Sequence, residues 1–363
     1  MMHNPIRVGI THGDFNGIGY EVIIKALDEE GITELFTPVI FGSPELLNQV
    51  RKDLGTETFR FTPVRSAAFA QDGKINIVDV CQRGLEMTPG HPSKEAGEAA
   101  VAALEAACIA LEDGDIDFIV TAPINKKTIY SEKFPFPGHT EFLAQRLADE
   151  SGKATMILFD DEIRVALVTT HKALRDVPEA ITKETVVNTV KNMDAALKQD
   201  FRMDKPRIAV LSLNPHNGDN GLLGTEEIEH IEPAIAECVA DGILAFGPFA
   251  ADGFFGTGDY TKYDGIVAMY HDQGLAPFKA LAREYGVNYT SGLKFVRTSP
   301  DHGTGYNIAG KNEADPTSMR QAIYQGIDLT RNREMHREAT ANPMPRAKQE
   351  RRQKPGSEEA KQD

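Results

Sequence analysis

The chain has 363 residues, of which 41% are hydrophobic, and its formal net charge is −15. This length predicts two domains, and the hydrophobic fraction suffices for a buried core, which excludes a mainly disordered chain and a disulfide-stapled miniprotein. The acidic balance argues against nucleic acid as the main partner, because a phosphate backbone is bound by basic surfaces.

The cysteine content and the apolar segments indicate a cytoplasmic protein. Cys81, Cys108 and Cys238 show no paired spacing, so no disulfide framework is expected and a reducing compartment fits. The first ten residues hold no apolar signal segment. The most apolar long stretch, residues 96–111, contains two glutamates and is too short to cross a bilayer. No membrane contact is therefore expected.

Short apolar runs alternate with amphipathic stretches along the chain. Strands are predicted at residues 6–11, 38–41, 74–80, 117–121, 164–170, 207–213 and 265–270. Helices are predicted from Glu21, from Pro44 behind a Ser43 N-cap, over 93–113, from Thr182 and over 225–240. Strands alternating with helices predict an α/β fold with a largely parallel sheet.

The first strand leads into a glycine-containing turn, Gly13–Gly19. This turn is not the G-x-G-x-x-G fingerprint, because Val22 stands three positions after Gly19, so a Rossmann fold is not predicted. A tight structural turn is the simpler interpretation. A second glycine-rich loop at 301–311 has little periodicity, so either a cofactor or packing must hold it.

A polar cluster follows the Pro-Phe-Pro stretch at 135–137, where a domain boundary is predicted. His139 and Thr140 begin a helix-like run in which Thr140 could be the cap, and free N–H groups at such a helix start attract anions. Lys279, Asn288 and Arg297 add cationic and hydrogen-bonding groups suited to a phosphate or carboxylate.

Three histidines share one context, since His171, His216 and His271 each lie just beyond a predicted buried strand. The carboxyl ends of strands converge on the ligand crevice of open α/β sheets, so the three imidazoles could meet in space. Three neutral imidazoles are a sufficient ligand set for a divalent metal with an open position. For any one of them alone, a hydrogen-bonded loop residue is the simpler interpretation.

The last segment, 331–363, contains no Val, Ile, Leu, Phe or Tyr and carries 9 basic and 6 acidic residues. Such a segment cannot offset its ordering entropy by burial. Its early part could extend a helix, and most of it is predicted to be a mobile charged tail.

Several of these blocks together resemble the 4-hydroxythreonine-4-phosphate dehydrogenase family of pyridoxal phosphate biosynthesis. The matching blocks are 137–141, 170–172, 212–216, 269–274 and 301–311. The resemblance implies a two-domain fold like that of isocitrate and isopropylmalate dehydrogenases. Residues 1–135 plus 298–330 would form domain one, and 136–297 would hold the metal, substrate and dimerisation residues. It also implies a homodimer with active sites at the subunit interface.

The resemblance carries over residue by residue. His171, His216 and His271 match the ligands of a divalent metal such as Zn, Mg or Co. The matches to substrate-binding positions are His139, Thr140, Lys279, Asn288 and Arg297. The expected cofactor is NAD or NADP, with Gly13, His302, Gly303, Thr304 and Asn312 as candidate contacts. No general acid or base is assigned, and Lys279, Asp252 and Asp272 are candidates by chemistry alone.

The implied reaction is oxidation of 4-phosphooxy-L-threonine followed by decarboxylation to 3-amino-2-oxopropyl phosphate. Three alternatives remain open. A dehydrogenase of a phosphorylated sugar acid, threonate or erythronate 4-phosphate, would use the same parts. A three-histidine metal hydrolase or aldolase would not need the 301–311 loop. A metal-binding structural protein would leave the polar strand ends unexplained.

Overall fold

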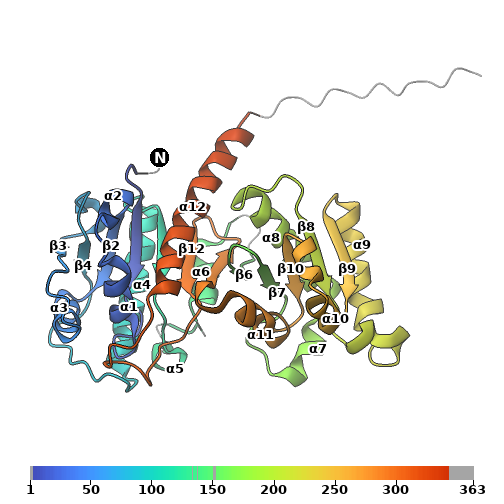
Figure 1. Ribbon diagram of the computed structural model, residues 1–363, viewed down its shortest axis with the longest axis horizontal. Helices are drawn as coiled ribbons and strands as arrows, with labels where there is room; N and C mark the ends of the chain where they lie inside the picture. Colours follow the sequence, from blue (N-terminus) through green and yellow to red (C-terminus); the bar gives the residue numbers. More distant parts are fainter. Residues whose placement is uncertain (1–2, 133, 137, 150–152, 343–363) are drawn as a thin grey trace, which may run out of the picture.

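The computed structural model describes residues 3–132, 134–136, 138–149 and 153–342. Within them one sheet of 12 strands runs through the molecule in the order β3-β4-β2-β1-β5-β12-β11-β6-β7-β10-β8-β9 (Figure 1). The strands are β1 Arg7–Thr11, β2 Thr37–Gly42, β3 Thr62–Val64, β4 Asn76–Asp79, β5 Phe118–Thr121, β6 Thr155–Phe159, β7 Arg164–Leu167, β8 Arg207–Leu211, β9 Leu244–Phe249, β10 Gly265–Ala268, β11 Val287–Ser291 and β12 Arg297–Pro300.

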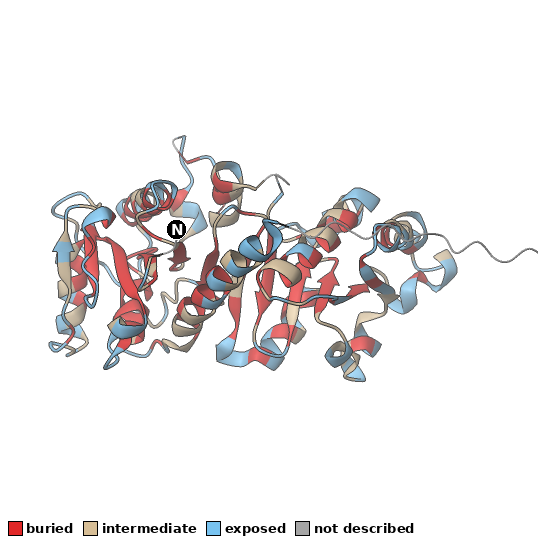
Figure 2. Cartoon of the chain, turned by 90° about the horizontal axis from the view of Figure 1, so that it is seen from above, coloured by how far each residue is buried: buried red, intermediate tan, exposed pale blue. Residues whose placement is uncertain are grey.

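Helices cover the sheet. They are α1 Gly19–Leu27, α2 Ile32–Leu35, α3 Pro44–Asp53, α4 Lys94–Glu112, α5 Lys126–Ile129, α6 His139–Leu147, α7 Val177–Ala180, α8 Lys183–Gln199, α9 Glu232–Ala240, α10 Ala251–Gly256, α11 His271–Ala282 and α12 Thr317–Thr340. Figure 2 shows the buried residues concentrated on the strands and on the helix faces turned toward them. None of the helices in the described part of the chain combines the length and apolar character that a membrane span requires.

The sheet consists of two parallel halves that are joined by antiparallel pairs. Strand β11 runs antiparallel to both β12 and β6, and β6 runs antiparallel to β7. The other strand pairs are parallel. The predicted α/β class with a largely parallel sheet is therefore confirmed, and each predicted strand overlaps an observed one. The division into two domains stays a prediction, since the sheet is continuous across it.

Local capping signals mark the starts of three of the predicted helices. The hydroxyls of Ser43, Ser93 and Thr182 accept hydrogen bonds from the first turns of α3, α4 and α8, as expected of N-caps. The expectation for Thr140 is wrong. The cap of α6 is Gly138, and no side-chain cap bond is present there. Thr140 lies inside the first turn because the helix already begins at His139.

The long helix α12 packs across the central strands. Gly326 is required there, because a Cβ at this position would lie 2.2 Å from the Phe118 ring. The helix continues through residues 331–340, so the early part of the predicted tail extends a helix, as the sequence allowed. Arg333 explains this, since its guanidinium forms a buried ion pair with Asp200. The rest of the predicted tail, 343–363, lies outside the described residues.

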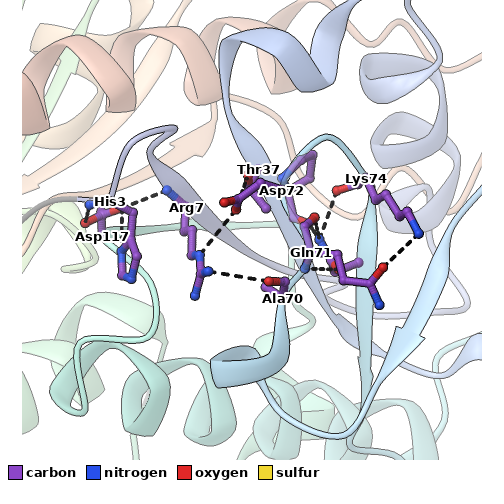
Figure 3. A network of polar contacts seen from close by, with 10 residues as sticks. His3, Arg7, Thr37, Ala70, Gln71, Asp72, Lys74 and Asp117 are labelled. Atoms are coloured by element: carbon purple, nitrogen blue, oxygen red, sulfur yellow. Dashed lines mark hydrogen bonds and ion pairs between the residues drawn. The ribbon is translucent and has the colours of Figure 1, made fainter.

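Polar contacts tie the start of β1 to its neighbours (Figure 3). The Asp117 carboxylate accepts hydrogen bonds from the backbone N–H of His3 at 3.0 Å and of Arg7 at 2.7 Å. Asn76 is held in a similar way, with its amide donating to three carbonyl groups. The two Asp117 bonds fix the register of β1 against β5 and so position the turn that follows β1. The Asn76 bonds instead connect β4 with β2 and with residues 71–74.

Candidate functional site

A polar cavity of roughly 380 Å³ lies over the central strands β6, β11 and β12. Its floor is one face of these strands, because the register pairs Asn288 with both Leu158 and Ser299. Arg297 lies two residues before Ser299 and so shares this face. The walls come from α6, from the start of α5 and from the segments after β7, β10 and β12. The lining residues include Thr121, Lys126, His139, Thr140, Glu141, Met156, His171, His271, Lys279, Asp301, His302 and Gly303.

Arg297 is the central cation of this cavity and is only 3% exposed. Its guanidinium donates to the hydroxyl of Thr121 at 3.0 and 2.6 Å and to that of Thr290 at 3.0 Å. Among the described residues no carboxylate lies within ion-pair distance of it. Burial lowers the pKa of Arg297 to about 10, and Glu141 opposes that shift. A buried cation without a counter-ion at a cavity wall is a site for an anion.

His139 stands next to Arg297 and is held neutral. The Arg297 Nη2 lies 3.4 Å from its Nδ1, and because a guanidinium only donates, Nδ1 is the acceptor. Desolvation lowers the pKa of His139 well below its usual value, and the charges of Arg297 and Lys126 add to this effect. The remaining ring nitrogen, Nε2, then carries the proton and can donate to a ligand.

Two buried polar atoms of residues that line the cavity have no partner among the described residues. They are Oδ1 of Asn288 and Nε2 of His302. Burial lowers the pKa of His302. Unpaired buried polar atoms are rare in folded proteins, so these two indicate a ligand or water that completes their hydrogen bonds.

Lys279 is the second cation of the set, and it is tied to the loop after β12. Its Nζ lies 3.0 Å from Oδ1 of Asp301. Burial raises the pKa of Asp301, and Lys279 opposes that shift. Of the three general acid or base candidates, Lys279 alone lines this cavity. Asp252 is exposed on α10, and the exposed Asp272 carboxylate is directed at Nδ1 of His271 at 2.7 Å.

Two of the predicted metal ligands meet in the cavity. The rings of His171 and His271 lie 6.1 Å apart, between centroids, beyond the ends of the adjacent parallel strands β7 and β10. Desolvation lowers the pKa of His171, with Lys126 adding to the effect, so its imidazole is neutral, which is the form that binds metals. The chemistry of this pair suits a divalent cation.

His216 does not join them within one chain. It is exposed and lies in a loop after β8 where residues 216–220 all have positive φ, which directs the segment outward. In the described part of the chain, no group of three or more His, Cys, Asp or Glu side chains is arranged to hold a metal. The strand-end rule placed His216 after β8, at the same edge of the sheet as His171 and His271, but it does not determine the path of the loop.

That loop is nevertheless well fixed. The carboxylate of Glu227, which is 1% exposed, accepts hydrogen bonds from the backbone N–H groups of Leu213 and Asn214, both at 2.8 Å. The side chain of Gln273, on α11, accepts from Met269 N at 2.7 Å and donates to Ser212 O at 2.6 Å. The segments that carry His216 and His271 are therefore linked.

Only some of the candidate cofactor residues line the cavity. His302 and Gly303 line the cavity. Gly13 lies behind it, with φ of +69° and no room for a Cβ, which would stand 2.2 Å from Pro123 O. Thr304 accepts from Ile18 N at 2.9 Å, which joins the two glycine-rich segments. Asn312 is exposed, and its carbonyl accepts from Lys25.

Sequence reasoning missed Lys126, which lines the cavity, and Tyr306, which connects neighbouring segments. Lys126 lies just after the end of β5 and could have been found by the strand-end rule that identified the histidines. Tyr306 was named only as part of its loop. Its hydroxyl donates to Asp14 at 2.7 Å and accepts from Asn125 at 2.9 Å, which connects both glycine-rich segments with the start of α5.

Comparison with known proteins gives the family. The model of the pyridoxal phosphate biosynthetic protein PdxA matches residues 34–326. The chain belongs to this family. A 4-hydroxythreonine-4-phosphate dehydrogenase of Bacteroides thetaiotaomicron is 52% identical over 344 residues, which are 95% of this chain and 94% of that protein.

Another family relative and a solved structure agree with this assignment. The crystal structure of a 4-hydroxythreonine-4-phosphate dehydrogenase from Klebsiella pneumoniae has a TM-score of 0.75 at 32% identity, covering 90% of this chain and 99% of that one. A relative from Oceanobacillus iheyensis, provisionally named for D-threonate 4-phosphate dehydrogenase, is 37% identical and covers 91% of this chain and 99% of its own. Membership in the PdxA family supports a dehydrogenase role in pyridoxal phosphate biosynthesis.

Proposed function

We propose that this protein oxidises 4-phosphooxy-L-threonine with NAD or NADP and a divalent metal. The β-keto acid formed then loses carbon dioxide to give 3-amino-2-oxopropyl phosphate. The observation that carries the proposal is Arg297, a buried guanidinium at the cavity floor without a carboxylate partner among the described residues. Such a group attracts a substrate phosphate or carboxylate by its charge, and the N–H of Nη1 that Thr290 does not use can donate to it.

The other cavity residues suit the same substrate. Lys279 adds a second positive charge for the substrate's other anionic group. His139 donates from Nε2, while Thr140 and Asn288 supply short-range hydrogen bonds that fix the orientation. The unpaired Oδ1 of Asn288 is an acceptor that a substrate amino or hydroxyl group can satisfy. This match favours a small, doubly anionic, hydroxylated substrate.

His171 and His271 would hold the divalent metal, with His216 as the third ligand. When bound, the metal supplies a Lewis acid that polarises the substrate oxygen and favours both hydride loss and decarboxylation. The nicotinamide cofactor supplies the hydride acceptor. The 301–311 loop, which contributes His302 and Gly303 to the cavity, is the best candidate to position it beside the substrate.

We also propose that the active form is a homodimer with its sites at the subunit interface. The exposed position of His216, away from the His171–His271 pair of its own chain, supports this. The test is subunit complementation. A mixture of His171→Ala and His216→Ala chains, each inactive alone, is expected to recover part of the wild-type activity if ligands come from two chains. Absence of recovery in proven mixed dimers would contradict the proposal.

The main test is product identification. Purified protein is incubated with Co²⁺, NAD or NADP and 4-phosphooxy-L-threonine, and the products are read by mass spectrometry. Formation of carbon dioxide, 3-amino-2-oxopropyl phosphate and reduced cofactor is expected. Threonate 4-phosphate and erythronate 4-phosphate are run in parallel, because the Oceanobacillus relative makes a sugar-acid phosphate the second candidate. A higher kcat/KM with either sugar acid would replace the first assignment.

A further inference from the structure

Lys126 makes a contact in the cavity that the proposed chemistry does not use. It is the first residue of α5, and its Nζ lies 2.8 Å from Nε2 of His171. An ammonium group only donates, so Nε2 is the acceptor and carries the lone pair of the neutral ring. Nε2 of His171, one of the two ring nitrogens that could bind a metal, is therefore occupied by a lysine.

We propose that Lys126 is an exchangeable partner of His171. Its ammonium holds the imidazole while no metal is bound, and a divalent cation that takes Nε2 releases the ammonium toward the anionic groups of the substrate. The release of the ammonium toward substrate rests on the proposed function. The competition between Lys126 and a metal for His171 depends only on this chain and a metal ion.

The exchange follows from the chemistry of one nitrogen. Nε2 has a single lone pair, so it cannot accept from Lys126 and coordinate a cation at once. A divalent ion at Nε2 would also stand within a few ångströms of the ammonium, where like charges repel strongly in a partly desolvated cavity. Lys126 and the metal therefore compete for His171.

Only the side chain of Lys126 needs to move. Its backbone is fixed, because Asn125 caps α5 by accepting from Lys127 N at 2.9 Å and also donates to Tyr306 at 2.9 Å. Gly138 leaves room beside it, since a Cβ at that position would already contact Lys126 Cε at 3.6 Å. The lysine stem has four rotatable bonds, so a swing across the cavity is available to it.

The cavity gives the released ammonium a destination. Lys126 lines the same space as Arg297 and His139, where the substrate's anionic groups are expected. Glu141 is the carboxylate whose charge acts on Lys126, and it also lines this cavity. Metal binding before substrate is the order that this arrangement favours.

The test compares Lys126→Met with Lys127→Met, its exposed neighbour, which does not line the cavity. Co²⁺ binding is measured by calorimetry on the full chain without substrate or NAD. Removing a competing charged hydrogen bond is expected to tighten Co²⁺ binding by about tenfold in Lys126→Met. Lys127→Met is expected to match the wild type. Unchanged or weaker Co²⁺ binding in Lys126→Met would overturn the proposal.

A second variant keeps the proposal testable if Lys126→Met misfolds. Lys126→Arg keeps a cation that only donates, so its Co²⁺ affinity is expected to stay near the wild-type value, and an affinity equal to that of Lys126→Met would refute the competition. In turnover assays, Lys126→Met is expected to raise the substrate KM by about tenfold with a smaller change in kcat. If the wild type shows no turnover, the proposed function fails while the Co²⁺ titration remains readable.

Discussion

Two buried arginines occupy different surroundings in this fold. Arg333 of α12 pairs with the Asp200 carboxylate at 2.7 and 3.0 Å and with the Tyr289 hydroxyl at 2.8 Å. Burial is the largest single effect and lowers the pKa of Arg333, but the charges of Asp200 and Tyr289 and their hydrogen bonds together outweigh it and raise that pKa. Within the described part of the chain, Arg297 of β12 contacts hydroxyls and an imidazole but no carboxylate, and burial lowers its pKa to about 10.

This difference in surroundings distinguishes a cation that stabilises the fold, Arg333, from one that is placed to bind a ligand, Arg297. Arg333 finds its counter-charge in the chain and joins α12 to the end of α8. Among the described residues Arg297 has no carboxylate within ion-pair distance, and it faces a cavity, so the proposed counter-charge is a ligand. A third buried basic group, His12, avoids the problem by staying neutral, because burial lowers its pKa to about 4. Arg333, Arg297 and His12 each lead to a separate prediction.

The largest effect is expected from Arg333→Met. This change leaves Asp200, which is 1% exposed, as an uncompensated buried charge, and the expected loss is about 3–5 kcal/mol in the free energy of unfolding. Urea denaturation followed by circular dichroism measures it. Adding Asp200→Asn should restore part of the loss. A loss below about 1 kcal/mol would show that the pair is not structural.

The opposite pattern is expected for Arg297→Met. The kcat/KM of the proposed reaction should fall by about 10²–10³-fold, or roughly 3–4 kcal/mol of transition-state binding, because the anion loses its buried partner. Stability should stay unchanged or rise, since an unpaired buried charge has been removed. A loss of stability as large as that of Arg333→Met would place both arginines in the structural class.

His12 predicts a pH dependence of stability. Its pKa is about 4 in the folded state against 6.5 as the reference, so the unfolded chain binds the proton first as the pH falls. Stability from this group is present above pH 6.5 and is lost on acidification toward pH 4. Between pH 7 and 5 the loss is about 2 kcal/mol.

The matched variants for that prediction are His12→Phe and His91→Phe. The first keeps a ring stacked on Tyr20, where the centroids lie 5.0 Å apart, and should remove the 2 kcal/mol of pH dependence. The second alters an exposed histidine and should leave the profile unchanged. Parallel pH profiles for wild type and His12→Phe would mean that His12 does not stay neutral.

The smallest effect is a thermal shift with inorganic phosphate. At about ten times its Kd, phosphate should stabilise the wild type by about 1.4 kcal/mol, or a Tm rise of roughly 1–3 °C. The shift should vanish in Arg297→Met and persist in Arg51→Met, a control whose arginine contacts Asn48 and Phe59 on α3 and its following loop. A shift that survives Arg297→Met would move the anion site elsewhere.

The sequence by itself marked seven of the twelve described strands and several of the cavity residues. Hydrophobic periodicity marked the parallel strands, and Ser43, Ser93 and Thr182 marked helix starts, because both signals depend on near neighbours in the chain. Residues after strand ends, or in short polar motifs, were enough to nominate His139, His171 and Arg297. The resemblance to the family tied them to one chemistry.

Only the tertiary structure determined which strands lie at the centre of the sheet and which buried charges are paired. Strand β12 reads Arg-Thr-Ser-Pro and carries no apolar pattern, yet all four residues are buried between β5 and β11. The outward path of the His216 loop is likewise invisible in sequence, and so is the lack of a carboxylate beside Arg297 among the described residues. The physical reason is that burial and pairing depend on which distant segments pack together, whereas propensity and capping act over a few residues.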